Sequence, residues 1–291
     1  MTLRHLRIFD AVCRNKSITK AAQELFIAQP AVSNTISEIE KHYSVVLFNR
    51  INRRLVITEQ GNYLWQKARA ALLSFDEFEQ CARDAESKPF FSLGATLTVG
   101  KLHVPHIAAS LEDRIEGLDL RLKIKPAGAL VDEILSGTLD VAIVEGNIHD
   151  QHIISIPVSQ DRLIAFQSAT NCFDCRMTLA ELSRLPLLMR ESGSACGEFI
   201  KNIFAANQCQ LSVKMESASN EAIITAVLAG LGVAILPEGL VSEYIADGRL
   251  REISILDVDL TRKYNIIYRK NRHFSPGQTA MLNICTDYFI N

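Results

Sequence analysis

Residues 17–33 read SITKAAQELFIAQPAVS, and this stretch predicts two short helices joined by a turn. Ser17 offers its side-chain oxygen to the free amides of a first helical turn. Ala21 and Ala22 lie on the face that this helix buries, where small side chains let a second helix cross closely. Pro30 suits the first turn of the next helix because it has no amide N–H to leave unpaired. We expect the first helix over residues 17–26 and the second to continue to about residue 42.

The second helix has one apolar face and one polar face. Val32, Ile36 and Ile39 recur at helical spacing and point inward. The residues on the opposite face are short or polar, and their side chains can reach base edges or phosphates: Ser33, Asn34, Thr35 and Glu38. The pattern therefore predicts a helix-turn-helix in which the second helix is the recognition helix.

The flanking segments predict a helix, a hairpin and a long helix. Apolar residues at helical spacing predict a helix over residues 3–15. Residues 47–57 carry a basic tip between two apolar stretches, which predicts a short hairpin that we interpret as a wing. From residue 59 to about residue 87 an apolar stripe recurs at spacings of three and four. The stripe consists of Leu64, Ala68, Leu72, Phe75, Phe78 and Ala82. Because such a stripe needs a partner, we expect this helix to pair with its twin in a homodimer.

Charge is distributed unevenly along the chain. The formal net charge is -2 over 291 residues. Residues 1–72 carry 11 Lys and Arg against 5 Asp and Glu, a balance of +6, so the remaining residues carry 20 against 28, a balance of -8. A basic N-terminal part favours contact with a polyanion such as DNA. A basic face that is merely solvated explains the same charge, so charge alone leaves both interpretations open.

Composition and targeting signals indicate an ordinary globular protein of the cytoplasm. The chain is 48% hydrophobic and 22% charged, and its length favours two domains. The first residues lack the apolar core of a secretory signal. The longest uncharged stretch, residues 222–237, is too short to span a bilayer, so no membrane partner is expected. Seven cysteines in such a chain favour reduced thiols over a disulfide framework.

The second part of the chain alternates strands and helices. Residues 88–95 contain Pro89 and Gly94 and lack periodicity, so we expect a hinge there. Strands are expected at residues 97–100, 120–124, 141–144, 163–166, 187–189, 213–215, 233–236 and 264–268. This alternation predicts largely parallel sheets covered by helices.

The sequence resembles the LysR-type transcriptional regulators. The segments SITKAAQEL (residues 17–25), QPAVS (29–33), IE (39–40) and LFNR (47–50) resemble the family's N-terminal signature. The segments LSGTLDVAI (135–143) and AGLGVAILP (229–237) resemble two recurring stretches of its effector domain. The resemblance departs at Ala28, where members often carry Ser, which removes one candidate phosphate contact. It also departs at residues 59–61, where a small residue commonly precedes the Gly.

The resemblance implies how the N-terminal domain meets DNA. In the family the recognition helix enters the major groove and the wing touches the backbone. Gln29, Ser33 and Asn34 are expected to contact bases or flanking phosphates, and Arg50, Arg53 and Arg54 to contact phosphates. The complete expected DNA-binding set is Ser17, Thr19, Gln29, Pro30, Ala31, Ser33, Asn34, Thr35, Glu38, Arg50, Arg53 and Arg54.

The resemblance also implies the fold of the remainder. The expected organisation is an all-α winged helix-turn-helix at 1–58, a dimerisation helix at 59–87, a hinge at 88–95 and an α/β effector domain at 96–291. The effector domain should contain two Rossmann-like subdomains, as in type 2 periplasmic binding proteins. Subdomain I is expected at about 96–160 and 268–291 and subdomain II at about 161–267. The chain should cross between them near residues 160–163 and again near 264–268.

The effector is expected in the cleft between the subdomains, beyond the carboxyl ends of the strands. The candidate contacts are Lys101, Leu102, His103, Gly128, Ala129, Glu145, Ser192, Gly193, Ser194, Asn220 and Glu221. Residues 190–194 resemble a segment that many members use near their effector. The continuation, residues 195–197, lacks an Arg that relatives often carry, so Lys101 and His103 are the alternative source of positive charge. These features favour an anionic or zwitterionic effector.

Metal, redox and catalytic roles find little support in the sequence. Cys172 and Cys175 form a single Cys-x-x-Cys without the second ligand pair that a structural zinc site needs. Cys196 is interpreted as a packing residue. His103 and His106, like His149 and His152, lack a setting that favours metal binding. We expect no cofactor, no metal and no enzymatic activity.

Two rival functions remain beside a ligand-controlled regulator. The second domain alone is compatible with a solute receptor, although the missing signal and the basic head argue against that function. A ligand-independent, structural DNA-binding protein would show strong salt dependence and little sequence preference. For the regulator, the expected partners are double-stranded operator DNA, a small effector and a second copy in a dimer or tetramer. RNA polymerase is a further candidate.

Overall fold

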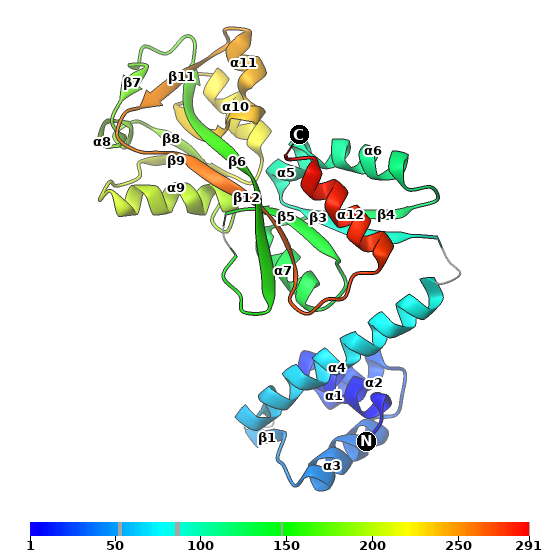
Figure 1. Ribbon diagram of the computed structural model, residues 1–291. Helices are drawn as coiled ribbons and strands as arrows, with labels where there is room; N and C mark the ends of the chain where they lie inside the picture. Colours follow the sequence, from blue (N-terminus) through cyan, green and yellow to red (C-terminus); the bar gives the residue numbers. More distant parts are fainter. Residues whose placement is uncertain (52–53, 85–87, 147, 291) are drawn as a thin grey trace. The chain divides into compact units, whose positions relative to one another are not determined.

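The computed structural model describes residues 1–51, 54–84, 88–146 and 148–290. The chain divides into two compact units, Met1–Ser87 and Lys88–Asn291 (Figure 1). Each unit is described by itself below.

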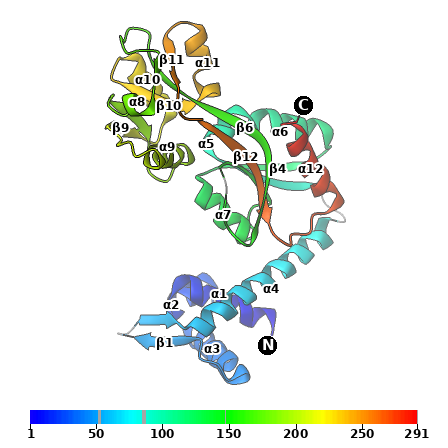
Figure 2. The same cartoon turned by 60° about the vertical axis from the view of Figure 1, so that its left-hand side comes forward.

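The N-terminal unit is a winged helix-turn-helix followed by one long helix. Its elements are α1 (Leu3–Asn15), α2 (Ile18–Glu24), α3 (Gln29–Tyr43), β1 (Phe48–Ile51), β2 (Arg54–Ile57) and α4 (Glu59–Asp84). Strands β1 and β2 pair in an antiparallel hairpin, which Figure 2 shows extending from the unit. The expected helix-turn-helix, wing and long helix are confirmed.

Local signals and a small core hold this unit together. The Ser17 hydroxyl accepts a hydrogen bond from the Lys20 amide at 3.3 Å, so Ser17 caps α2 as predicted. Ala21 and Val32 are completely buried in a core that α1, α2 and α3 share. A Cβ at Gly61 would lie 2.3 Å from the Leu47 carbonyl oxygen. The start of α4 therefore requires glycine in order to approach the wing.

The turn between α2 and α3 contains a strained aromatic residue, Phe26. Its φ is +54°, and its side chain is 95% exposed. An L-residue in this left-handed region carries a steric cost that Asn tolerates better. Since packing contributes almost nothing here, we expect Phe26→Asn to raise the free energy of unfolding by about 1 kcal/mol, measured by urea denaturation.

The control for this prediction is Tyr63→Asn, because Tyr63 is an exposed aromatic residue inside α4. Asn is a poorer helix former than most residues, so this substitution should not stabilise the protein. An equal gain in both variants would contradict the role of the backbone conformation.

The C-terminal unit has an α/β architecture. Its strands are β3 (Phe90–Ala95), β4 (Asp119–Ile124), β5 (Val141–Glu145), β6 (Ile153–Ser168), β7 (Arg176–Met177), β8 (Leu187–Arg190), β9 (Val213–Ser217), β10 (Val233–Pro237), β11 (Leu250–Ile255) and β12 (Thr261–Arg269). Its helices are α5 (Leu97–Leu102), α6 (Val104–Arg114), α7 (Ala127–Leu135), α8 (Leu179–Leu182), α9 (Ala195–Ala206), α10 (Asn220–Leu228), the 3-10 turn η1 (Glu238–Leu240), α11 (Ser242–Ala246) and α12 (Pro276–Asp287).

The C-terminal unit has two lobes, and one continuous strand order runs through both of them: β4-β3-β5-β12-β6-β10-β8-β9. Lobe I contains β3, β4, β5 and β12 with the first part of β6, and α5, α6, α7 and α12 accompany it. Lobe II contains the second part of β6 with β7 to β11 and the helices α8 to α11. Both orientations show β6 and β12 as the long strands that run from one lobe toward the other. The expected pair of α/β subdomains is confirmed.

The chain crosses between the lobes twice, on the paired strands β6 and β12. The first crossing lies where it was expected, and the second does not. Strand β6 pairs with β12 up to Arg162 and with β10 from Leu163 onward, which agrees with a first crossing near residues 160–163. Tyr264 already pairs with Glu145 of β5 in lobe I. The second crossing therefore falls before Tyr264, and the boundary expected at residue 268 was placed too late. The long β-ladder conceals this point in the sequence, since its apolar pattern continues through the crossing.

The segment expected to be a hinge is largely a strand. Phe90–Ala95 forms β3, which pairs in parallel with both β4 and β5, and residues 97–100, expected as a strand, begin α5. Gly94 suggested a flexible linker, but a Cβ there would lie 2.6 Å from the Leu130 and Leu139 side chains. Close packing against these leucines, which only the tertiary structure reveals, explains this glycine. β7, β11 and the first part of β6 were not predicted either.

Candidate DNA-binding surface and effector cleft

The recognition-helix candidate α3 presents the expected polar face. Asn34 and Glu38 are exposed, Ser33 and Thr35 are half-buried, and Val32, Ile36 and Ile39 are buried. Gln29, Pro30 and Ala31 are exposed in the first turn, and Ala28 before them makes no side-chain cap. Pro30 has no amide N–H, and the Ala31 and Val32 amides donate to the Ala28 carbonyl oxygen, at 3.0 and 3.4 Å. The exposed side chains of α3 therefore remain its candidate contacts with DNA.

Two of the expected DNA contacts, Ser17 and Glu38, have local structural roles. Ser17 caps α2, and Thr19 is exposed in the first turn of α2. The Glu38 carboxylate lies 3.2 Å from His5 Nε2. Glu38 therefore also ties α3 to α1.

The expected basic wing is positioned by the hairpin. Arg50 lies on β1 opposite Leu55, and Arg54 lies on β2 opposite Ile51. Arg53 lies outside the described residues. The phosphate contacts of these arginines remain predictions.

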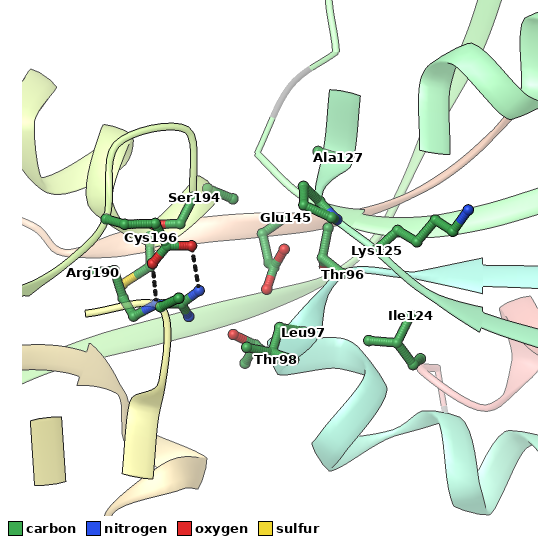
Figure 3. A pocket seen from close by; sticks show the side chains of 14 residues that line it. Thr96, Leu97, Thr98, Ile124, Lys125, Ala127, Glu145, Arg190, Ser194 and Cys196 are labelled. Carbon is green, nitrogen blue, oxygen red and sulfur yellow. Dashed lines mark hydrogen bonds and ion pairs between the residues drawn. The ribbon is translucent and has the colours of Figure 1, made fainter. Parts of the chain in front are cut away.

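A pocket in the C-terminal unit lies between the two lobes (Figure 3). Its volume is about 190 Å³, below the 300–1,000 Å³ of typical drug-sized sites. Its lining consists of Thr96, Leu97, Thr98, Ile124, Lys125, Pro126, Ala127, Glu145, Arg190, Glu191, Ser194, Ala195, Cys196 and Ala218. The lobe I residues follow the ends of β3, β4 and β5, and most lobe II residues belong to the end of β8 and the start of α9.

Only Glu145 and Ser194 among the expected effector contacts line this pocket. Lys101 was expected in a loop but lies on α5, where it pairs with Glu221 of α10. Leu102 belongs to the same helix and packs against the lobe II core. These three residues connect the lobes instead of lining the pocket.

The remaining expected contacts lie around the pocket but outside its lining. His103 packs against Tyr264, Tyr288 and Phe289 in lobe I. Gly128 and Ala129 lie in the first turn of α7 rather than in a loop. Three others follow β8 or begin α10: Ser192, Gly193 and Asn220.

The lining residues that the sequence did not single out include Thr96, Thr98 and Lys125. Arg190 was noted only as part of the segment 190–194 and was not among the expected contacts. Thr96 directly follows β3 and precedes α5. It was overlooked because the first strand was expected at residues 97–100 instead of 90–95. Arg190 is 5% exposed and binds Glu191 through Nε and Nη2, at 2.8 and 3.0 Å, and Asn220 through Nη1, at 2.8 Å. The hydrogen bonds from Arg190 lower the pKa of Glu191.

Helix beginnings from both lobes face the pocket. Ala127 starts α7 in lobe I, and Ala195 starts α9 in lobe II. The Ser194 hydroxyl accepts the Gly197 amide at 3.0 Å and so caps α9. Amides in a first helical turn lack acceptors inside their helix, and the helix dipole favours negative charge there.

A buried charged cluster lies behind the pocket, where the two crossing strands meet. Arg262 of β12 donates hydrogen bonds from Nε and Nη2 to Asp161 of β6, at 2.9 and 2.7 Å. The Arg262 Nη2 atom lies 3.6 Å from Glu145 Oε1. Burial is the main cause that raises the pKa of Asp161, and the Arg262 charge opposes it.

Two family descriptions together match almost the whole chain. "LysR substrate binding domain" matches residues 86–290, and "Bacterial regulatory helix-turn-helix protein, lysR family" matches residues 3–62. The chain belongs to the LysR family of transcriptional regulators. Since one chain carries both domains, the regulator is favoured over the solute receptor and over a DNA-binding protein without ligand control.

Curated relatives extend over nearly the same length as this LysR-family chain. An uncharacterised regulator of Escherichia coli K12, YeiE, is 29% identical over 286 residues, which cover 98% of this chain and 97% of the relative. The transcriptional activator CmpR of Synechocystis is 29% identical over 283 residues, covering 94% and 91%. Among solved structures, a full-length OxyR variant from Pseudomonas aeruginosa is similar with a TM-score of 0.68 and 21% identity, covering 99% of this chain and 94% of that chain. The structural likeness supports the fold.

The cysteines of this LysR-family protein differ in accessibility. Cys172 and Cys175 are exposed and unbridged, and Cys196, which lines the pocket, is buried. Burial raises the pKa of the Cys196 thiol to about 12, so the helix start does not activate it and its role is packing. Within the described ranges, no cluster of metal-binding side chains is found, and no helix has the length and apolarity needed to cross a bilayer.

Proposed function

We propose that this LysR-family regulator binds operator DNA through α3 and that a small effector in the pocket between lobes I and II controls this binding. The observation that carries the proposal is the convergence of α7 and α9, which begin in different lobes and line the same pocket. A ligand that contacts both helix beginnings favours one arrangement of the lobes, because it bridges two lobes that the long strands β6 and β12 join. An effector changes a conformational equilibrium only through such differential binding.

The DNA-binding part of the proposal rests on α3 and its surroundings. The exposed polar residues of α3 suit base contacts, and the arginines on the hairpin β1–β2 support a role for this hairpin as a wing that contacts the DNA backbone. We propose that the protein acts on operator DNA in the cytoplasm, with RNA polymerase as a further candidate partner.

The proposed assembly is a homodimer or a tetramer built through α4. This helix has 26 residues, and the Phe78 side chain on its predicted apolar stripe is 67% exposed. Burial of an exposed aromatic residue against a second copy is favourable because it removes apolar surface from water.

Substitution of Ala195 by Trp tests the effector pocket. Ala195 lines the pocket at the first turn of α9, so a bulky side chain should fill the space that a ligand needs. The full-length protein is first screened by thermal shift against oxyanions, carboxylates, amino acids and aromatic acids, since a ligand of the folded state raises Tm. We expect Ala195→Trp to abolish the rise produced by any active compound, together with its effect on operator binding.

The matched control is Ala206→Trp, at the exposed end of the same helix. This variant should respond to the same compound as the unchanged protein does. If Ala195→Trp folds normally and retains the full response, the ligand binds elsewhere and the pocket assignment is wrong.

A further inference from the structure

The Glu145 side chain is buried at the pocket and incompletely paired. Glu145 ends β5, is 5% exposed and lines the pocket, with its carboxylate directed into the space between the lobes (Figure 3). Its Oε1 lies 3.6 Å from Arg262 Nη2, which is beyond hydrogen-bond distance. Its Oε2 is buried and has no hydrogen-bond partner in the part of the chain that the structure describes. Buried carboxylates are normally paired, so this oxygen requires an explanation.

The hydrogen bonds of Arg262 go to Asp161 rather than to Glu145, while Arg262 Nη1 has no hydrogen-bond partner within the described residues. Arg262 donates two hydrogen bonds to Asp161, and the Tyr264 hydroxyl contributes another. The cluster contains two carboxylates, Glu145 and Asp161, and a single guanidinium, that of Arg262. Both carboxylates therefore share Arg262, which donates hydrogen bonds to Asp161 and approaches Glu145 to 3.6 Å without a hydrogen bond, so Glu145 is the less completely paired of the two.

The described cations around the pocket are already paired with other groups. Lys125 pairs with Glu133, and its side chain extends away from Glu145 in Figure 3. Arg190 is held by Glu191 and Asn220. Burial, and to a smaller extent the neighbouring His106, lower the pKa of His103. Both effects favour the neutral imidazole, so they do not support a charged His103 that would neutralise Glu145.

Other parts of the pocket lining favour an anionic group, whereas Glu145 favours a cationic one. Thr96 is 4% exposed, and its hydroxyl has no hydrogen-bond partner within the described residues. The beginnings of α7 and α9 also line the pocket, and their helix dipoles favour an anionic group there. The pocket thus combines a carboxylate that has one unpaired oxygen with the Thr96 hydroxyl, which has no hydrogen-bond partner in the described chain.

We propose that the effector carries a protonated amine that binds Glu145 and an anionic group that binds the Thr96 hydroxyl and the helix beginnings. This inference rests on the proposed function, because it concerns the same pocket. The volume of about 190 Å³ corresponds to about six water molecules at about 30 Å³ each. A small amino-acid-like zwitterion matches both this size and the arrangement of charges.

The first test needs no ligand and uses the variant Glu145→Gln of the full-length protein. If Glu145 is kept for a ligand amine, its incompletely paired charge destabilises the ligand-free protein, and the neutral amide of similar shape should raise the Tm of the C-terminal unit by about 2–4 °C. If Glu145 instead serves as a structural partner of Arg262, the same change should lower Tm. A lower Tm overturns the proposal. Glu221→Gln is the control, because Glu221 is exposed and outside the pocket lining.

The second test compares ligands that differ only in an amine and a hydroxyl. Alanine and lactate, aspartate and malate, and glutamate and 2-hydroxyglutarate are titrated against the full-length protein by calorimetry. We expect the member of a pair that fits the pocket to bind about tenfold or more tightly when it carries the amine, since a charge-assisted hydrogen bond is then formed. Glu145→Gln should remove this preference. A hydroxy acid that binds as tightly as its amino partner overturns the proposal, and if none of the pairs binds, the Tm of Glu145→Gln decides.

The two proposals fail in different ways. A ligand whose binding is lost in Ala195→Trp but shows no preference for the amine refutes only the inference about Glu145. A ligand that still binds Ala195→Trp refutes the pocket itself.

Discussion

Replacing Arg262 by Met is expected to lower the free energy of unfolding of the C-terminal unit by about 3–5 kcal/mol. The Arg262 side chain is 2% exposed in its contact with Asp161, and it is the cation shared by Asp161 and Glu145. Removal of the guanidinium leaves two carboxylates in a buried site where β6 and β12 cross. Met preserves much of the apolar volume, so the loss reports on charge more than on a cavity. The measurement is urea denaturation followed by circular dichroism.

The same variant should show a characteristic dependence on pH. Burial already raises the pKa of Asp161, and loss of Arg262 raises it further. An acid whose pKa is higher in the folded than in the unfolded state makes the folded protein more stable at low pH than at high pH. This stability is lost as the pH rises through the folded-state pKa. The destabilisation should therefore be smaller at about pH 5 than at about pH 8.

The control is Lys263→Met, at the exposed neighbouring position of β12. An exposed substitution of this kind typically changes stability by less than about 0.5 kcal/mol. Similar losses in the two variants, or a loss at Arg262 that does not depend on pH, would show that the buried charge is not the cause.

Replacing Ser33 and Asn34 together by Ala is expected to weaken operator binding by about a hundredfold. Both residues lie on the outer face of α3, and Asn34 is exposed. Each base contact contributes about 1–3 kcal/mol of discrimination, and neither side chain belongs to the buried face that holds the fold. Affinity for unrelated DNA should change little, because phosphate contacts carry most of it. Fluorescence anisotropy with operator and unrelated duplexes at one salt concentration measures both affinities.

Gln66→Ala serves as the control for this pair, since Gln66 is exposed on α4, away from the recognition helix. It should leave both affinities unchanged. Equal loss of affinity for operator and unrelated DNA in the Ser33 and Asn34 variant would reassign these residues to phosphate contacts.

The helix-turn-helix could be predicted from the sequence because its signals are local. The hydroxyl of Ser17, the paired alanines and Pro30 act within one or two helical turns, and the structure shows the helices that these signals predict. The apolar spacing of Val32, Ile36 and Ile39 likewise predicts which face of α3 is buried. The resemblance to the LysR family extended this local prediction to the second domain, and the two family matches confirm it.

The strand at Phe90–Ala95 shows where local signals fail. Pro89 and Gly94 are turn-forming residues by themselves, but β4 and β5 supply the hydrogen bonds of this strand. Leu130 and Leu139 supply the reason for the glycine. Both partners are distant in sequence, so a pattern read along the chain assigns the segment to a hinge.

The sequence by itself determined the two-domain organisation, the helix-turn-helix, the wing and the family, because caps, helical periodicity and motifs depend on neighbouring residues. The tertiary structure decided which side chains line the pocket and how their charges are paired. Thr96, Glu145, Arg190 and Ala195 meet only after four separate elements have packed. Whether a carboxylate has a counter-ion depends on which strand end lies opposite it, and it is the crossing of β6 and β12 that joins Arg262 to Asp161 and leaves one oxygen of Glu145 facing the pocket without a partner in the described chain.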